Sequence, residues 1–153
     1  MRKLKLYIAC DHAGYKMKTK VIKALNKKYD FVDLGCNSTD SVDYPKYAFA
    51  LCKKVLKDKC LGILICGTGF GVSIAADKVK GIYCTCVVKP EMAACAKEHN
   101  NCNVITLSGK YVTLKDNIKI INNFVNAKFD PKDQNNKRHV RRLKMIADYE
   151  KNH

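Results

Sequence analysis

The chain has 153 residues, with 29 Lys and Arg against 14 Asp and Glu and a net charge of +15. This length suits one domain, so we expect residues 1–153 to form a single domain. No run approaches the roughly 18 apolar residues of a membrane span, and the apolar stretch near the start is shorter than the about 7–15 residues of a signal-peptide core. We therefore expect a soluble, cytoplasmic protein whose charge attracts an anionic partner.

The chain contains nine cysteines, an odd number, and no secretion signal. Both facts argue against a disulfide framework. The spacing also lacks the two close ligand pairs of a structural zinc site, so no metal is expected. Most of these cysteines lie in apolar runs, where we expect small, reduced core residues.

Short apolar runs alternate with longer stretches of helical spacing. The expected strands span residues 5–10, 31–34, 61–66, 82–88 and 103–107. The expected helices span residues 15–28, 45–57, 114–126 and 138–149, with two more that end near residue 78 and begin after residue 90. Such alternation predicts a three-layer α/β/α Rossmann-like sandwich, with a five-stranded parallel sheet and a C-terminal helix. Ligands of such sheets bind beyond the carboxyl ends of the strands.

A loop with three alternating glycines, Cys66–Ser73, follows the most apolar strand. Glycines let backbone N–H groups approach a ligand, and a helix start favours negative charge, so the loop predicts an anion or oxyanion cradle. The spacing fits neither a dinucleotide fingerprint nor a Walker A loop. A tight turn that needs glycine only for packing is the alternative. Cys66, at the head of the loop, is either a thiolate base or nucleophile, or another core cysteine.

Polar residues stand at other candidate positions. Asp11 and His12 follow the first strand, although an aspartate there also suits helix capping. His99 and Asn100 precede the fifth strand, and we expect them at the same sheet edge as Cys66. Arg138 and Arg142 share a helix face at i, i+4 spacing and could clamp a phosphate, or form a solvated basic face.

Together these motifs resemble type B ribose-5-phosphate isomerases, in the family that also holds galactose-6-phosphate isomerase subunits. The resemblance covers nearly the whole chain. The motifs that carry it are Asp11-His12-Ala13-Gly14, Asp43-Tyr44-Pro45, Gly62-Ile63-Leu64-Ile65-Cys66-Gly67-Thr68-Gly69, Ser73-Ile74-Ala75-Ala76, His99-Asn100, Asn103-Val104 and Arg138-His139.

The resemblance implies an aldose–ketose isomerase that interconverts ribose 5-phosphate and ribulose 5-phosphate through a cis-enediolate, without a metal or cofactor. Cys66 would be the base that moves the proton between C2 and C1. Thr68 would assist proton exchange between the two enediol oxygens. The amides that would hold the enediolate are those of Gly67, Gly69, Phe70 and Gly71.

The resemblance also implies how the sugar phosphate binds. His99 would open the furanose ring as an acid–base group, with Asn100 and Asp11 positioning hydroxyls and Tyr44 lining the site. The implied phosphate ligands are His12, Arg138 and Arg142, with Lys110 in place of a family arginine. In this family the last helix reaches the neighbouring subunit's active site, which implies a homo-oligomer, a dimer or a tetramer, with shared sites.

Departures from the family pattern leave alternatives open. Asp77 and Tyr83 stand where the family usually has Asn and Arg, and an aspartate close to Cys66 would disfavour its thiolate. An isomerase of a six-carbon sugar phosphate, such as allose 6-phosphate or galactose 6-phosphate, is the nearest alternative. A non-catalytic sugar-phosphate binder is another. Neither a nucleic-acid nor a membrane partner is expected, because only the net charge supports one.

Overall fold

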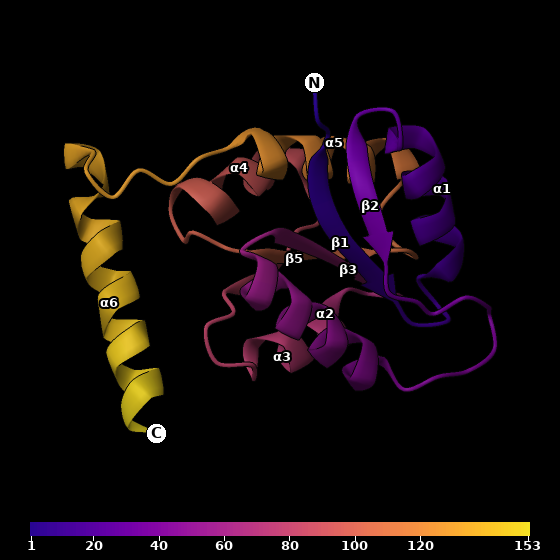
Figure 1. Cartoon of the computed structure of the whole chain (residues 1–153), viewed down its shortest axis with the longest axis horizontal. Helices are drawn as coiled ribbons and strands as arrows, with labels where there is room; N and C mark the ends of the chain where they lie inside the picture. Colours follow the sequence, from indigo (N-terminus) through magenta and orange to yellow (C-terminus); the bar gives the residue numbers. More distant parts are fainter.

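The computed structural model describes all residues, 1–153, as strands and helices that alternate along the chain (Figure 1). The strands are β1 (Leu4–Cys10), β2 (Tyr29–Asp33), β3 (Leu61–Cys66), β4 (Cys84–Cys86) and β5 (Val104–Ser108). The helices are α1 (Tyr15–Leu25), α2 (Tyr44–Asp58), α3 (Phe70–Asp77), α4 (Pro90–Glu98), α5 (Leu114–Asn126), the 3-10 turn η1 (Gln134–Asn136) and α6 (Lys137–Asn152). The expected elements are thus confirmed, with boundaries that differ by a few residues.

The five strands form one parallel sheet in the order β2-β1-β3-β5-β4. The central strand β3 is buried on both faces, as its unbroken apolar run predicts. Strand β2 is added on one side of β1 and strand β3 on the other, so the strand order reverses between β1 and β3. Crevices at such a reversal, beyond the carboxyl ends of the strands, are where α/β sheets bind ligands.

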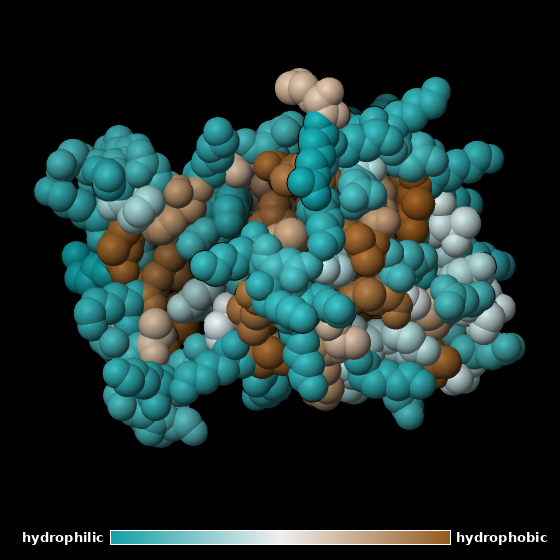
Figure 2. Space-filling view, viewed as in Figure 1, coloured by the Kyte–Doolittle hydropathy of each residue, from teal (hydrophilic) through white to brown (hydrophobic).

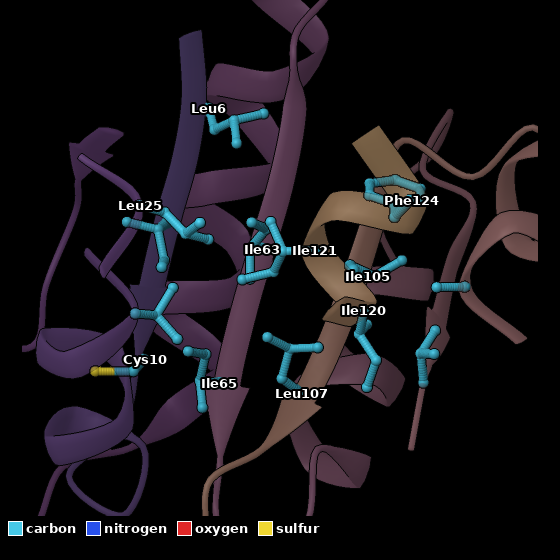
Figure 3. Packing of buried hydrophobic residues seen from close by; sticks show 14 of the residues in the cluster. Leu6, Cys10, Leu25, Ile63, Ile65, Ile105, Leu107, Ile120, Ile121 and Phe124 are labelled. Carbon is cyan, nitrogen blue, oxygen red and sulfur yellow. The ribbon is translucent and has the colours of Figure 1, made fainter. Parts of the chain in front are cut away.

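Helices cover both faces of the sheet, which gives the expected three layers (Figure 1). Alternate residues of a strand face opposite sides, so Leu6 and Ile8 of β1 pack on one face while Tyr7 and Ala9 pack on the other. The first face carries α1, α4 and α5, and Figure 3 shows its side chains meeting between the sheet and α5. The second face carries α2 and α3.

Strand β4 lies at the sheet edge, pairs only with β5 and is shorter than the expected seven-residue strand. Side chains replace the ladder at its start. Asn103 Oδ1 accepts the Tyr83 N–H at 3.0 Å, and Asp77 Oδ1 accepts the Cys84 N–H at 2.9 Å. These side-chain acceptors satisfy the backbone where a longer strand would otherwise continue.

All nine cysteines are free, as expected. Five of them are buried, three are half-buried and only Cys95 is exposed. Burial raises the pKa of Cys10, Cys52 and Cys102 to about 12. These thiols therefore act as small apolar side chains within the core.

Helix α6 stands beside the three layers rather than within them, after an extended segment that leaves α5 (Figure 1). A cavity of about 410 Å³ separates α6 from the body and is lined by Ile82, Tyr83, Leu143 and Ile146 among others. Figure 2 shows brown, apolar side chains along this boundary. No helix in the structure combines the length and the apolar character needed to cross a membrane.

Candidate active site

Three loops meet at the carboxyl edge of the sheet, after β1, β3 and β5. Their contact depends on glycine: a Cβ atom on Gly14 would lie 2.2 Å from the Ile65 carbonyl oxygen. The Gly109 N–H donates to the Cys66 carbonyl at 2.9 Å, which ties the β5 loop to the end of β3. The edge predicted from the sequence thus holds a compact group of loops.

Cys66 is the last residue of β3 and is only 5% exposed. Its Sγ accepts a hydrogen bond from the Gly69 N–H at 3.1 Å. Gly69 has a φ of +86°, and a Cβ there would lie 2.8 Å from the Cys86 Sγ, so only glycine suits this position. The loop therefore aims an N–H donor at the sulfur, and such a donor stabilises a thiolate.

The loop amides differ in whether they have an acceptor within the chain. The Gly69 N–H donates to Cys66, and the Phe70 N–H donates to Thr68 Oγ1 at 3.1 Å. The amides of Gly67, Thr68 and Gly71 have no acceptor. Of the four amides expected to hold an oxyanion, Gly67 and Gly71 are therefore free and the other two are engaged. Thr68 adds a free amide that the sequence reasoning missed.

Four further expected residues lie with this loop. Asp11 is buried and accepts the Gly14 N–H at 3.0 Å. Gly14 is itself the N-cap of α1, so Asp11 does not perform the capping role considered as the alternative. The Val42 N–H donates to His12 Nδ1 at 3.2 Å, which leaves Nε2 to carry the proton of a neutral ring. The Tyr44 ring lies against Gly71, and the Lys110 N–H donates to the Gly67 carbonyl at 3.0 Å.

His99 and Asn100 lie at the opposite edge of the sheet. Helix α4 runs back from the carboxyl edge, so the segment after it stands at the amino ends of the strands. The Asn103 carbonyl accepts the N–H of Gly62, near the start of β3, whereas Cys66 ends that strand. At about 3.3 Å per residue these points are roughly 13 Å apart. The expectation of a shared edge was therefore wrong, because a loop before a parallel strand lies at its amino end.

The amino edge has its own cluster of ionisable side chains, which α6 completes. The rings of His99 and His139 stack with centroids 4.5 Å apart and an interplanar angle of 8°. They line a cavity of about 270 Å³ together with Asn100 and Arg142. Loss of solvent and the nearby positive charges of Arg138, His99 and Arg142 lower the pKa of His139.

His139 is the residue of this cluster to which sequence reasoning gave no role. Arg138 lies one residue before it, with an exposed side chain whose Nη1 donates to the Asn135 carbonyl at 3.3 Å. The signal was available in the sequence, since His139 falls within the basic run at the start of this helix. The spacing of the arginines alone did not reveal that the histidine between them packs against His99.

Asp77 does not lie beside Cys66, although α3 follows the glycine loop. It ends α3, whereas the loop precedes the start of that helix, and its carboxylate binds the Cys84 N–H. Burial raises the pKa of Asp77, and the backbone hydrogen bond from Cys84 lowers it. The carboxylate at this position therefore binds the start of β4 rather than the loop around Cys66.

The sheet and its loops define an α/β/α enzyme domain with a thiol and free amides at the strand-order reversal. The family model described as "Ribose/Galactose Isomerase" matches residues 6–146. The chain belongs to this ribose/galactose isomerase family.

Several named relatives are similar along nearly their full length. The "Probable ribose-5-phosphate isomerase B" of Mycoplasma genitalium is 46% identical over 150 residues, which cover 95% of each chain. The "Ribose-5-phosphate isomerase B" of Mycobacterium tuberculosis is 33% identical over 156 residues, covering 100% of this chain and 94% of the relative.

Solved structures agree with these sequence relatives. Ribose-5-phosphate isomerase B of Clostridium thermocellum superposes with a TM-score of 0.90 at 35% identity, covering 97% of this chain and 99% of the other. The Mycoplasma genitalium enzyme, solved with bound ribulose-5-phosphate, gives a TM-score of 0.88 at 43% identity and 99% coverage of both chains.

Proposed function

We propose that this chain, acting as one domain over residues 1–153, is an aldose–ketose isomerase that interconverts ribose 5-phosphate and ribulose 5-phosphate. The observation that carries the proposal is the buried Cys66 thiol, held by the Gly69 N–H beside unpartnered loop amides. The names of the relatives support the same reaction. The ribulose-5-phosphate bound by the Mycoplasma genitalium enzyme supports this substrate class.

The reaction moves one proton between neighbouring carbons. In this mechanism the Cys66 thiolate takes the proton from C2 of open-chain ribose 5-phosphate, and the electron pair forms the C1–C2 enediolate. The same thiol returns the proton to C1, which yields ribulose 5-phosphate. Thr68 carries a proton between the oxygens on C1 and C2. Each preorganised N–H donor to the developing charge contributes about 10²–10³-fold in rate.

The remaining groups open the sugar ring and hold the phosphate. His99 acts as the acid–base group for ring opening, with Asn100, Asp11 and Tyr44 around the sugar. The phosphate ligands in this proposal are His12, Lys110, Arg138 and Arg142. Arginine suits this role because its planar guanidinium can make two parallel hydrogen bonds to a phosphate.

These residues occupy opposite edges of the sheet in one chain, so we propose that a complete site combines two copies. Cys66 and its loop come from one copy, and the cluster of His99, Asn100, Arg138 and Arg142 comes from the other. A two-fold axis would form two such sites per dimer, since it uses the same surfaces on both copies. Helix α6, which carries both arginines, suits this arrangement because it stands beside the three layers of its own chain.

Turnover by the purified protein tests the proposal. We expect conversion of ribose 5-phosphate to ribulose 5-phosphate, measured by the change in ultraviolet absorbance on ketose formation, at a rate that a chelator leaves unchanged. Allose 6-phosphate and galactose 6-phosphate serve as comparison substrates. Faster turnover of either would assign the site to a six-carbon sugar phosphate. Binding without turnover of any of the three would indicate the non-catalytic alternative.

Arg142→Ala separates binding from chemistry. We expect KM for ribose 5-phosphate to rise about 10–100-fold, because a hydrogen bond to a charged group contributes about 1.5–3 kcal/mol. The kcat should change much less, since the phosphate is remote from C1 and C2. Arg141→Ala is the matched control, because its side chain leaves the same helix in a different direction. An unchanged KM in Arg142→Ala would remove this arginine from the phosphate site.

A further inference from the structure

Two buried hydroxyl side chains of β5 lie against the glycine loop Cys66–Ser73. Thr106 is 0% exposed and Ser108 is 1% exposed. They alternate with Ile105 and Leu107, which pack into the core on the opposite face. Burying a hydroxyl without a hydrogen-bond partner costs free energy. The acceptors of these two hydroxyls therefore show which backbone groups they fix.

Both hydroxyls donate to carbonyls of the loop. Thr106 Oγ1 donates to the Gly69 carbonyl at 2.7 Å, and Ser108 Oγ donates to the Gly67 carbonyl, also at 2.7 Å. The Gly67 carbonyl accepts a second hydrogen bond from the Lys110 N–H. Ser108 Oγ in turn accepts the Tyr111 N–H at 2.9 Å. The hydroxyls thus join the loop after β3 to the strand and loop that carry Lys110.

The direction of these carbonyls sets the direction of the next amides. A trans peptide is planar, so its C=O and the following N–H point opposite ways. With the Gly67 and Gly69 carbonyls turned toward β5, the N–H groups of Thr68 and Phe70 point away from it. The Thr68 N–H is free, and the Phe70 N–H donates to Thr68 Oγ1. The Gly67 and Gly69 carbonyl oxygens would repel an enediolate oxygen. Because they face β5, they lie on the opposite side of the loop from these N–H groups.

Glycine makes this restraint necessary. Glycines adopt many backbone conformations, and a loop with glycine at 67, 69 and 71 could rotate its peptides at little cost. The φ of +86° at Gly69 is one conformation among several open to it. Hydrogen bonds from the inner strand β5 select that conformation. An oxyanion site requires such donors to be in place before the reaction begins.

We propose that Thr106 and Ser108 are positioning residues for the isomerisation. Ser108 holds the Gly67 carbonyl so that the free Thr68 N–H faces the enediolate. Thr106 holds the Gly69 carbonyl so that the Phe70 N–H fixes the Thr68 hydroxyl. The inference rests on the proposed function. It predicts an effect on kcat rather than on KM, because the donors they orient act on charge that develops only during the reaction. Of the proposed phosphate ligands, Arg138 and Arg142 lie at the opposite edge of the sheet, away from these hydroxyls.

The test uses Thr106→Val, which keeps the side-chain shape but removes the donor, and Thr106→Ser, which keeps the hydroxyl. We expect kcat for ribose 5-phosphate to fall about 10–100-fold in Thr106→Val, with KM changed less than about threefold, since a well-placed proton-transfer group such as the Thr68 hydroxyl contributes about 10²–10⁴-fold. Thr106→Ser should recover most of the lost kcat. Ser108→Ala should lower kcat in the same way and provides a second variant if Thr106→Val folds poorly.

Tyr29→Phe is the matched control, because it also removes a hydroxyl of a buried side chain. Tyr29 lies on the outer strand β2, and its hydroxyl donates to Asn122 of α5 at 2.7 Å. This variant should leave kcat unchanged, whereas its thermal unfolding midpoint should fall because a hydrogen bond is lost. Unchanged kcat in both Thr106→Val and Ser108→Ala, with active unmodified protein, would overturn the inference and leave the proposed function standing. An equal loss in Thr106→Ser would overturn it too, by assigning the effect to packing. Absence of turnover in the unmodified protein would instead overturn the proposed function.

Discussion

We expect the replacement of Cys66 by alanine to lower kcat for ribose 5-phosphate by about 10²–10⁴-fold, the usual contribution of a positioned proton-transfer group. The sulfur is the only side-chain base at the head of the loop, and the Gly69 N–H that donates to it has no other acceptor. The phosphate ligands are untouched, so binding of the substrate should persist. Turnover and isothermal titration with ribose 5-phosphate measure the two effects separately.

Cys52→Ala is the control for the loss of a buried thiol. Cys52 is 0% exposed and belongs to the same core cluster as Cys66, on the face covered by α2 and α3. Its loss should reduce thermal stability without removing turnover. Near-normal kcat in Cys66→Ala would take this residue out of the base role and would leave the reaction to another group at the same edge.

Two inactive variants should restore each other when they are mixed. One chain carries Cys66→Ala and the other carries both His99→Asn and Arg142→Ala. If each site combines the loop of one copy with the α4–α6 cluster of the other, a mixed dimer contains one intact site of two. Random assembly from equal amounts then recovers roughly a quarter of full activity, because half of the dimers are mixed.

Co-expression with two different affinity tags allows the mixed species to be isolated and assayed. The control mixture replaces the second chain by one that carries Cys66→Ala as well, so no loop retains its thiol and no activity returns. Recovery in the first mixture alone supports sites shared between copies. Activity no greater than the sum of the two parents would show that each site lies within a single chain.

Most of the fold could be predicted from local sequence patterns. Alternating apolar runs and helical stripes were enough for the strand and helix order, because each pattern reflects what that segment buries. The length of β4 could not be predicted from these patterns. It depends on the side chains of Asp77 and Asn103, which accept backbone N–H groups in place of a neighbouring strand. Asp77 is 7 residues from Cys84 and Asn103 is 20 residues from Tyr83, and neither spacing belongs to a strand or helix pattern.

The candidate site divides in the same way. The loop around Cys66 could be predicted, because glycine spacing and the end of a buried strand are both visible in the sequence. The placement of His99 was missed, although a residue between a helix and the next parallel strand must stand at the amino edge. The stacking of His99 on His139 could not be foreseen, since it depends on where α6 returns after a polar loop.

The buried cysteines have a consequence for the chemical selectivity of this protein. Because burial raises the pKa of Cys10, Cys52 and Cys102 to about 12, these thiols keep their protons at neutral pH. A protonated, enclosed sulfur neither attacks alkylating reagents nor exchanges with disulfides at a useful rate. Three of the nine cysteines are thus closed to electrophiles, so covalent labelling is directed to the others, of which Cys95 is exposed.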